Sequence, residues 1–239
     1  MMGYTPNSAG VRLEGGLLMQ LKDIIKMIDH TIIKQDACWD EVRQVIDEGI
    51  RHQAASVCIP PSYLTVAKAY AGDAIPIAVV NAFPFGYQTT AAKVFEIREA
   101  IESGADEVDM LINIGWLRDK DDRAVTDELS QIKNIVGDKI LKVIIEACLL
   151  TDEEKIRACK IITEAGADYI KTSTGLAAGG ATPHDIMLFA ANIGAGVKIK
   201  ASGGIRTIED AEKFIALGAS RIGSSQIIRA LDIARNQHE

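Results

Sequence analysis

Two lysines and an aspartate occur where short apolar segments end and small polar residues follow. Lys171 precedes "TSTG", Lys200 lies in "VKIKASGG", and Asp109 lies in "GADEVDML". Lysine is seldom fully buried without a partner, and the strand ends of α/β proteins commonly carry reactive groups. If the three side chains meet, they could carry out Schiff-base chemistry, in which a lysine amine attacks a carbonyl carbon.

Such chemistry requires that one lysine be uncharged near neutral pH. The pKa of a free lysine is about 10.4, and lowering it by about three units takes roughly 4 kcal/mol. Burial and a neighbouring cation both disfavour the ammonium form. One lysine would form the Schiff base and the other would stay cationic and help to shuttle protons. Asp109 would orient a water molecule or accept a proton.

A structural role is the alternative for each lysine. A single lysine near a strand end is more often solvated or paired with a carboxylate, and we favour this interpretation for Lys142 and Lys198. For Lys171 and Lys200 together the catalytic interpretation is favoured, because both enter glycine-rich loops from predicted neighbouring strands.

Three segments of similar sequence begin at a glycine. They are "GADEVDML" at Gly104, "GADYIKTS" at Gly166 and "GASRIGSS" at Gly218. In each, the glycine ends a helix-like stretch and a short strand follows, as in the αβ loops of α/β proteins. With further short apolar runs, the predicted strand centres are residues 57, 79, 108, 143, 170, 199 and 222, and a weaker eighth strand surrounds Asp29.

The segments between these strands have the apolar spacing of amphipathic helices. In one of them, Val94, Ile97 and Ile101 form a stripe, and Lys93 is expected away from it. Thr151, followed by three acidic residues, predicts the start of another helix. Strands that alternate with helices predict a parallel sheet covered on its faces.

Eight such units predict an α/β fold of the TIM (β/α)8 barrel type, whose usual size is roughly 250 residues. We expect a single domain over residues 17–239, which includes an N-terminal helix, and a flexible tail over residues 1–16. An open, doubly wound sheet is the alternative. Against it, the chain has no GxGxxG after the first strand and no acidic residue at the spacing that dinucleotide binding requires.

Residues of a strand alternate between its two faces, so the side chains that point into the barrel can be predicted. The inward set is Glu107, Asp109, Leu111, Tyr169, Lys171, Lys198 and Lys200. Their apolar neighbours, such as Val108 and Ile170, suit packing against helices. Because the chemistry of these barrels lies at the carboxyl ends of the strands, we expect Asp109, Lys171 and Lys200 to converge in the mouth.

The last two predicted strands end in loops suited to an anion. Gly203, Gly204 and Gly223 allow backbone amides to approach a ligand, and Ser224 and Ser225 precede the last predicted helix. TIM barrels often build a phosphate site from these two loops. The alternative is that the glycines only form tight turns and that the serine hydroxyls cap the helix.

Composition and charge argue against several classes of function. A formal net charge of −7, with lysines scattered among acidic residues, argues against nucleic-acid binding. No run approaches the roughly 18 apolar residues of a membrane helix, and no signal peptide is evident, so we expect a soluble cytoplasmic protein. The four cysteines and four histidines show no metal-binding spacing, so no metal site is expected.

Several segments, in the same order along the chain, resemble the deoxyribose-phosphate aldolase family. They are "IDHT", "ASVCIPPSY", "FPFG", "GADEVDML", "LKVIIEACLLTDEEK", "GADYIKTSTG", "ATPHD", "KASGGIRT" and "RIGSS". The resemblance implies a class I aldolase on a TIM barrel that cleaves 2-deoxy-D-ribose 5-phosphate reversibly to acetaldehyde and D-glyceraldehyde 3-phosphate. It also implies that the substrate is a small sugar phosphate, that no metal or other cofactor is needed and, on this basis alone, that the protein forms a homodimer.

The resemblance also assigns roles to residues. It implies that Lys171 forms the Schiff base, that Lys200 perturbs it and that Asp109 belongs to the proton relay. Gly204 and Ser225 match positions that contact phosphate. The other candidate substrate-binding residues are Gly203, Gly223, Ser224, Thr172 and, as more peripheral matches, Asp29 and Lys142.

The chain departs from the family pattern at one position. Some members have a basic residue directly after "KTSTG", whereas this chain has Leu176, which weakens the expectation that this loop grips phosphate with a charged side chain. Cys58 matches a cysteine seen near the pocket in relatives, but a small core residue is the favoured interpretation.

Two rival functions stay open at this point. One is another Schiff-base barrel aldolase, acting on a ketose phosphate. The other is a non-catalytic barrel that binds sugar phosphates, against which the intact pair of Lys171 and Lys200 argues.

Overall fold

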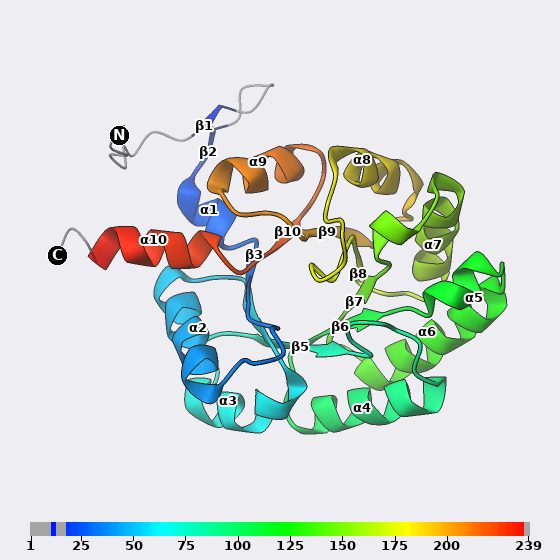
Figure 1. The fold of residues 1–239 in the computed structure, drawn as a ribbon, viewed down its shortest axis with the longest axis horizontal. Coiled ribbons are helices and arrows are strands. Elements are labelled where there is room, and N and C mark those ends of the chain that lie inside the picture. The colour runs from blue at the N-terminus through cyan, green and yellow to red at the C-terminus, as the bar shows by residue number, and fades with distance from the viewer. Residues whose placement is uncertain (1–10, 13–17, 237–239) are drawn as a thin grey trace.

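Eight parallel strands close into a barrel in the computed structural model, which describes residues 11–12 and 18–236 (Figure 1). The order around the barrel is β10-β3-β4-β5-β6-β7-β8-β9. The strands are β3 (Ile28–Thr31), β4 (Ser56–Ile59), β5 (Ile77–Asn81), β6 (Glu107–Leu111), β7 (Ile140–Ile144), β8 (Tyr169–Lys171), β9 (Lys198–Ser202) and β10 (Arg221–Ser224). The predicted TIM barrel and all eight predicted strands are confirmed, and the closed sheet excludes the open alternative.

Helices surround the barrel as a ring (Figure 1). They are α1 (Leu21–Ile25), α2 (Trp39–His52), α3 (Leu64–Ala71), α4 (Thr90–Glu102), α5 (Ile114–Arg118), α6 (Asp122–Val136), α7 (Asp152–Glu164), α8 (Pro183–Asn192), α9 (Ile208–Ala216) and α10 (Ile227–Asn236). Short 3-10 turns, η1 (Pro61–Tyr63) and η2 (Ala147–Leu149), follow β4 and β7. Among the described residues, no helix is both long and apolar enough to cross a membrane.

Part of the predicted N-terminal tail is structured. Two short strands, β1 (Val11–Arg12) and β2 (Leu18–Met19), pair antiparallel outside the barrel. Residues 1–10 and 13–17 lie outside the described residues, so the flexibility of the tail stays a prediction. The predicted N-terminal helix corresponds to α1.

The aspartates of the two "GAD" segments connect neighbouring strands of the barrel. The carboxylate of Asp106 accepts a hydrogen bond from the backbone N–H of Ile77, at 2.9 Å, and Asp168 accepts one from Leu141, at 2.8 Å. Each aspartate therefore ties the start of its own strand to the start of the preceding strand. This bracing sets the strand register, and the register decides which side chains meet inside the barrel.

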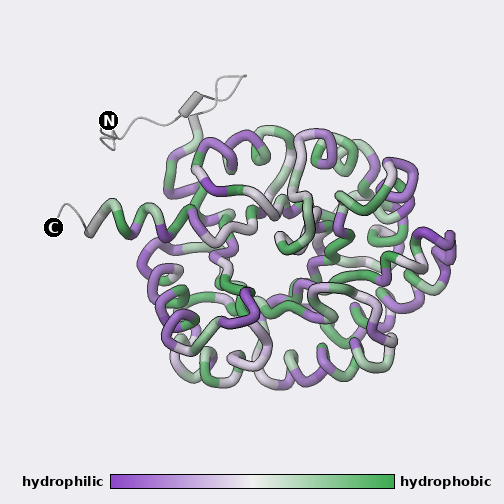
Figure 2. The backbone as a smooth tube through the Cα atoms, viewed as in Figure 1, coloured by the Kyte–Doolittle hydropathy of each residue, from purple (hydrophilic) through white to green (hydrophobic). Residues whose placement is uncertain are grey.

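Threonine hydroxyls begin three helices of the second half of the barrel. Thr151, Thr182 and Thr207 each accept a hydrogen bond from the third backbone N–H of the helix that follows. The start predicted at Thr151 is confirmed, and Glu154 returns a bond to its backbone in a capping box. Hydrophobic and hydrophilic residues alternate along the helices of the ring, as amphipathic covers of a sheet require (Figure 2).

The prediction that Lys93 faces away from the apolar stripe of α4 is wrong. Ile97 is buried as predicted, but Lys93 is also fully buried. Its ammonium donates to Glu128 of α6, at 2.7 Å, and to the carbonyl oxygen of Leu111 at the end of β6, at 3.0 Å. A helix face can bury a lysine when the neighbouring helix supplies a carboxylate, and α4 packs directly on α6.

We predict that Lys93→Met destabilises the fold by about 3–5 kcal/mol, because it leaves the buried carboxylate of Glu128 without its cation. The double variant Lys93→Met/Glu128→Leu should recover most of the loss. Urea denaturation followed by circular dichroism measures both. A double variant no more stable than the single one would show that packing, not the unpaired charge, causes the loss.

Candidate active site

Three predicted side chains meet inside the barrel. The ammonium nitrogen of Lys171, on β8, lies 2.8 Å from Asp109 Oδ2, and that of Lys200, on β9, lies 2.6 Å from the same oxygen. Lys171 and Lys200 are register partners on neighbouring strands. Val108 precedes Asp109 and Ile170 precedes Lys171 in the sequence. Both belong to the hydrophobic core between the sheet and the helices, so the predicted alternation is confirmed.

A second layer of charges lies around and beneath these three groups. Lys142, on β7, donates to Asp109 Oδ1 at 2.7 Å, lies 3.2 Å from Asp29 and also contacts Glu107. Arg221, on β10, donates to Asp29 Oδ1 at 2.5 Å and to both oxygens of Glu107 at 3.1 and 3.2 Å. Asp29 also pairs with Lys200, which joins the two layers into one network.

The charges of this network balance only if one lysine is neutral. Its carboxylates are Asp29, Glu107 and Asp109. Its cations other than Lys171 are Lys142, Lys200 and Arg221. Three negative and three positive charges sum to zero with Lys171 as an amine, and to +1 with Lys171 as an ammonium. A net charge buried away from water is costly, so the surroundings favour the amine.

The pKa values of the two lysines shift in opposite directions. Burial is the largest influence on Lys171; Asp109 opposes it and Lys200 reinforces it, so the pKa lies below its ordinary value of 10.5. Burial also disfavours the ammonium of Lys200, but Asp109 and Asp29 outweigh burial and raise the pKa of that group. Burial alone would raise the pKa of Asp109, yet the surrounding lysines hold it well below 3.8. The two lysines that share the ionised carboxylate of Asp109 are therefore driven apart: the amine form becomes more accessible at Lys171 and the ammonium form is favoured at Lys200.

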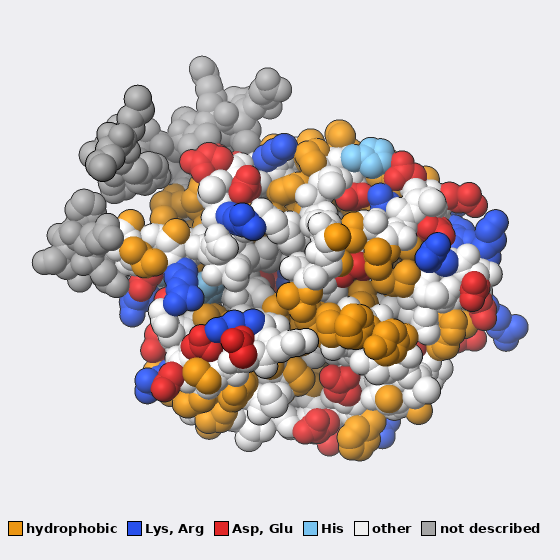
Figure 3. Space-filling model, viewed as in Figure 1, with side chains coloured by type: hydrophobic (Ala, Val, Ile, Leu, Met, Phe, Trp, Pro, Cys, Tyr) orange, Lys and Arg blue, Asp and Glu red, His pale blue; other side chains and the backbone are white. Residues whose placement is uncertain are grey.

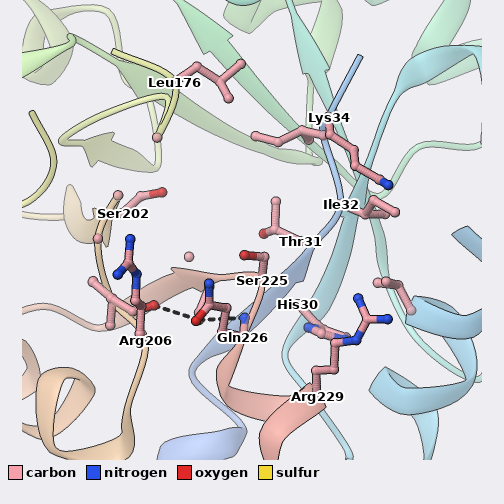
Figure 4. A pocket seen from close by; sticks show the side chains of 18 of the residues that line it. His30, Thr31, Ile32, Lys34, Leu176, Ser202, Arg206, Ser225, Gln226 and Arg229 are labelled. Atoms are coloured by element: carbon pink, nitrogen blue, oxygen red, sulfur yellow. Dashed lines mark hydrogen bonds between the residues drawn. The ribbon is translucent and has the colours of Figure 1, made fainter. Parts of the chain in front are cut away.

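A cavity of about 750 Å³ opens above this network at the carboxyl ends of the strands (Figure 4). Lys171 is among the residues that line it, whereas Asp109 and Lys200 lie beneath. Asp29 and Lys142, predicted as peripheral substrate contacts, are fully buried in the charge network. Thr172 is also fully buried, and its hydroxyl exchanges hydrogen bonds with the backbone of Ser202.

The predicted anion loops line the same cavity. Gly203, Gly204, Gly223, Ser224 and Ser225 all contribute to its wall. The hydroxyl of Ser224 donates to the carbonyl of Ile205 and accepts from backbone N–H groups at the start of α10. Ser224 thus has the capping role of the alternative interpretation, while Ser225 is exposed beside it.

Two glycines allow close approaches that no other residue would permit. A Cβ atom on Gly203 would lie 2.9 Å from the Cα of Gly180, on the loop that crosses from β8 to α8. A Cβ atom on Gly223 would lie 2.6 Å from Ser202 Oγ and 3.3 Å from the side chain of Lys200. These contacts bring two loops together and leave space for the Lys200 side chain.

Sequence reasoning missed the basic side chains around the cavity. Lys34, Arg206 and Arg229 line it, and Figure 4 shows Lys34 and Leu176 on the side opposite Arg206 and Arg229. No charged side chain follows "KTSTG", but Arg206, after β9, and Arg229, on α10, supply positive charge to the cavity. Lys34, after β3, is paired with Glu41, which also lines the cavity. The sequence signal for these residues is their position, because each lies a few residues after the end of a predicted strand.

Glu146 is a second residue that the sequence did not reveal. It follows β7 in a left-handed backbone conformation, with φ 45°, and is buried. Its carboxylate accepts from the backbone N–H of Thr174, at 3.2 and 3.3 Å, and from the Thr174 hydroxyl, at 2.5 Å. Glu146 therefore fixes the start of the loop that carries Gly175 and Leu176 over the cavity.

Glu107, which was predicted to point into the barrel, and Arg221, which was not predicted, complete the charge network, and the repeats contain the signal for both. In the aligned repeats, Glu107, Tyr169 and Arg221 share one position, and Asp109 and Lys171 share the position two residues later. Both positions point into the barrel, one layer below the other. A charged residue at the deeper position therefore indicates ion pairs below the reacting lysines. We call this layer, which contains Glu107 and Arg221 together with their partners Asp29 and Lys142, the floor of the barrel.

The mouth also carries exposed apolar side chains, visible as orange atoms across this face in Figure 3. Phe85 and Tyr87 stack after β5 with ring centroids 5.3 Å apart, and Leu149 and Leu176 are exposed after β7 and β8. Cys58, on β4, lies near the buried lysines and is itself fully buried. Burial raises the pKa of its thiol to about 11. In the part of the chain that the structure describes, no group of His, Cys, Asp and Glu is arranged to hold a metal ion.

Comparison with known proteins assigns this chain to a family. The sequence pattern of the DeoC/LacD family of aldolases matches residues 23–226. The chain belongs to the DeoC/LacD aldolase family. It is an aldolase and therefore a carbon–carbon lyase, and the resemblance identified in its motifs is confirmed.

Relatives of similar length support the membership in the DeoC/LacD family. A deoxyribose-phosphate aldolase of Clostridioides difficile strain 630 is 51% identical over 211 residues, which cover 88% of this chain and 96% of that protein. One from Streptococcus agalactiae serotype Ia is 50% identical over 219 residues, covering 92% and 97%. Among solved structures, the aldolase QR15 has a TM-score of 0.84 at 33% identity and covers 91% of this chain and 99% of its own. A deoxyribose phosphate aldolase from Aeropyrum pernix, whose structure is tetrameric, has a TM-score of 0.80 at 28% identity, covering 88% and 92%.

We predict that Gly223→Ala lowers the aldolase activity about 100-fold, because a displacement of about 1 Å at a reacting group has an effect of this size. The new methyl group would press on Ser202 and push the side chain of Lys200 out of place. Steady-state kinetics measures the loss. Gly115→Ala, in α5 away from the cavity, is the matched control and should keep its activity.

Proposed function

We propose that this aldolase cleaves 2-deoxy-D-ribose 5-phosphate reversibly to D-glyceraldehyde 3-phosphate and acetaldehyde through a Schiff base on Lys171. The observation that carries the proposal is the shared carboxylate of Asp109, which holds Lys171 and Lys200 within 2.8 Å while their pKa values shift apart. Two relatives that are about 50% identical carry the name of this activity. The proposal extends that activity to this chain.

The first step is attack by the Lys171 amine on the C1 aldehyde of the open-chain sugar. The hydroxyl group of the resulting carbinolamine takes up a proton and leaves as water, and the iminium that forms carries a positive charge on the nitrogen. Asp109 Oδ2 is 2.8 Å from that nitrogen and is held ionised, so it stabilises the iminium without any rearrangement of the site. Desolvation therefore favours the amine before attack, and the same carboxylate favours the charged product of attack.

The second step breaks the bond between C2 and C3. The C3 hydroxyl loses its proton through Asp109, Lys200 and a water molecule, and the electron pair of the C2–C3 bond moves into the iminium. Glyceraldehyde 3-phosphate leaves, and an enamine of two carbons stays on Lys171. Protonation of the enamine carbon and hydrolysis release acetaldehyde and restore the amine. Lys200, with its raised pKa, is an ammonium before and after it takes part in this proton relay.

The phosphate group would bind at the wall of the cavity formed by the loops after β9 and β10. Gly203 and Gly204 place backbone there, Ser225 stands before the N-terminus of α10, and Arg206 lines the same wall. Backbone N–H groups at a helix start and a guanidinium both favour a phosphate. Binding energy from this remote group would position the sugar carbons over Lys171.

We predict that acetaldehyde with borohydride adds a two-carbon group to Lys171 and leaves Lys198 unmodified. Lys198 is the exposed first residue of β9, two residues before the buried Lys200, so it reports nonspecific modification. Peptide mass mapping identifies the labelled lysine. Label on another lysine, or an unmodified Lys171, would remove the assignment. Lys171→Met should still bind the sugar phosphate and should cleave none of it.

A substrate comparison separates this proposal from the rival activity on a ketose phosphate. The same trapping with a ketose phosphate would label Lys171 with the larger ketone fragment, and cleavage of that substrate would be faster than cleavage of deoxyribose phosphate. The homodimer implied by the resemblance stays a prediction, which sedimentation of the purified protein tests.

We predict that kcat/KM falls as the pH drops through the pKa of Lys171. This fall, the acid limb of the pH profile, should lie below the pH at which an ordinary lysine titrates. The reason is that only the amine attacks, and burial lowers the pKa of this group. A pH profile of kcat/KM for the free enzyme measures it. A limb at the pH of an exposed lysine would show that the site does not hold the amine uncharged.

A further inference from the structure

We propose that Arg221 is a positioning residue that keeps Lys171 uncharged by neutralising the carboxylates of Asp29 and Glu107 beneath it. The proposal rests on the Schiff-base role of Lys171 and concerns a side chain that does not line the cavity. Arg221 would act on the reaction only through the charge balance of the barrel interior.

The geometry places Arg221 as a bridge between two strands. Its Nη1 donates to Asp29 Oδ1 of β3 at 2.5 Å and to the two oxygens of Glu107 of β6 at 3.1 and 3.2 Å. The guanidinium carbon lies 5.4 Å from the centre of the Tyr169 ring, a cation–π contact. The side chain is only 11% exposed, so water screens these contacts little.

The same carboxylates connect this floor to the reacting lysines. The second oxygen of Asp29 contacts Lys200 and lies 3.2 Å from Lys142, and Glu107 contacts Lys142. Lys142 and Lys200 then bind Asp109, the carboxylate that faces Lys171. A chain of four contacts therefore joins Arg221 to Lys171 through Asp29, Lys200 and Asp109. It runs through an interior where charges interact more strongly than in water, so a charge removed at Arg221 affects Lys171.

Removal of Arg221 alone would leave three carboxylates facing two cations besides Lys171. The network would then be electrically balanced only with Lys171 as an ammonium. The groups that face Lys171 or its partners from the barrel strands are Asp29 (β3), Cys58 (β4), Glu107 and Asp109 (β6), Lys142 (β7), Tyr169 (β8), Lys200 (β9) and Arg221 (β10).

The remaining titratable neighbours do not restore this balance. Cys58 has its pKa raised to about 11, so it stays a neutral thiol near pH 7. Glu146, after β7, is occupied by Thr174, and His30 pairs with Glu48 of α2. Removing one positive charge from the floor thus favours protonation of Lys171 and depletes the nucleophile.

An arginine suits this position because its charge persists at every pH at which the enzyme works. The pKa of Arg221 is raised further by Asp29 and Glu107, although burial opposes the rise. Its planar group donates to both carboxylates at once, which a lysine does with less geometric control.

The test is the pH profile of kcat/KM in Arg221→Met. We expect activity at pH 7 to fall about tenfold or more, and the loss to shrink as the pH rises, because the acid limb moves to higher pH. Glu107→Gln alone should move the limb to lower pH. The double variant Arg221→Met/Glu107→Gln, which removes one charge of each sign, should return the limb towards that of the unmodified enzyme.

Two controls separate charge from packing. Arg221→Lys keeps the charge and should keep the limb near its original pH. Arg157→Met removes a partly buried arginine between α6 and α7, outside the barrel, and should leave the profile unchanged. Circular dichroism and urea denaturation report whether each variant is folded.

A loss in Arg221→Met that is equal at every pH, or a double variant shifted as far as the single one, would overturn the proposal. If Arg221→Met does not fold, Glu107→Gln decides, because an unmoved limb in that variant contradicts the charge balance. Trapping of acetaldehyde on Lys171 of the unmodified enzyme is measured in parallel. With trapping intact and the limb unmoved, only the role of Arg221 fails; without trapping, the proposed function itself fails.

Discussion

The carboxylate of Asp109 is the contact around which the interior of this aldolase is organised. Lys142, Lys171 and Lys200 approach its two oxygens within 2.6–2.8 Å, and each of the four side chains is at most 2% exposed. One carboxylate cannot neutralise three ammonium groups in a dry interior. The protein meets this constraint with two more carboxylates, Asp29 and Glu107, and with surroundings that lower the pKa of Lys171.

The barrel makes such a concentration of charge stable. Strand alternation sends the polar residues of every second position inward and the apolar ones outward, so the helices cover a continuous hydrophobic layer. Arg221 and Glu107 occupy the deeper inward layer, and Asp109 and Lys171 occupy the one above it. Layers of this kind are filled by apolar side chains in most TIM barrels, and here they hold ion pairs.

The mouth follows a different physical principle from the floor. Loops shape the cavity, through the close backbone approaches at Gly203 and Gly223, the hydrogen bonds between Glu146 and Thr174, and the serine before α10. Hydrogen bonds fix these loops, whereas net charge controls the floor. Lys171 is the residue at which the two regions meet, because it belongs to the network and also lines the cavity.

The amino-acid sequence by itself determined the eight strands, the closed barrel and the convergence of Asp109, Lys171 and Lys200. These features follow from local patterns: the repeated glycine after each helix, the alternation along each strand, and the rule that parallel strands end on one side. Only the tertiary structure decided that Asp29 and Lys142 lie in the floor, that Lys93 is buried against Glu128, and that Glu146 holds the Thr174 loop. Each of these depends on a partner 28 to 113 residues away in the chain. From sequence alone, a charged residue is predicted to be exposed unless its partner is known. Strand register and helix packing decide which partner it meets, and no local pattern specifies them.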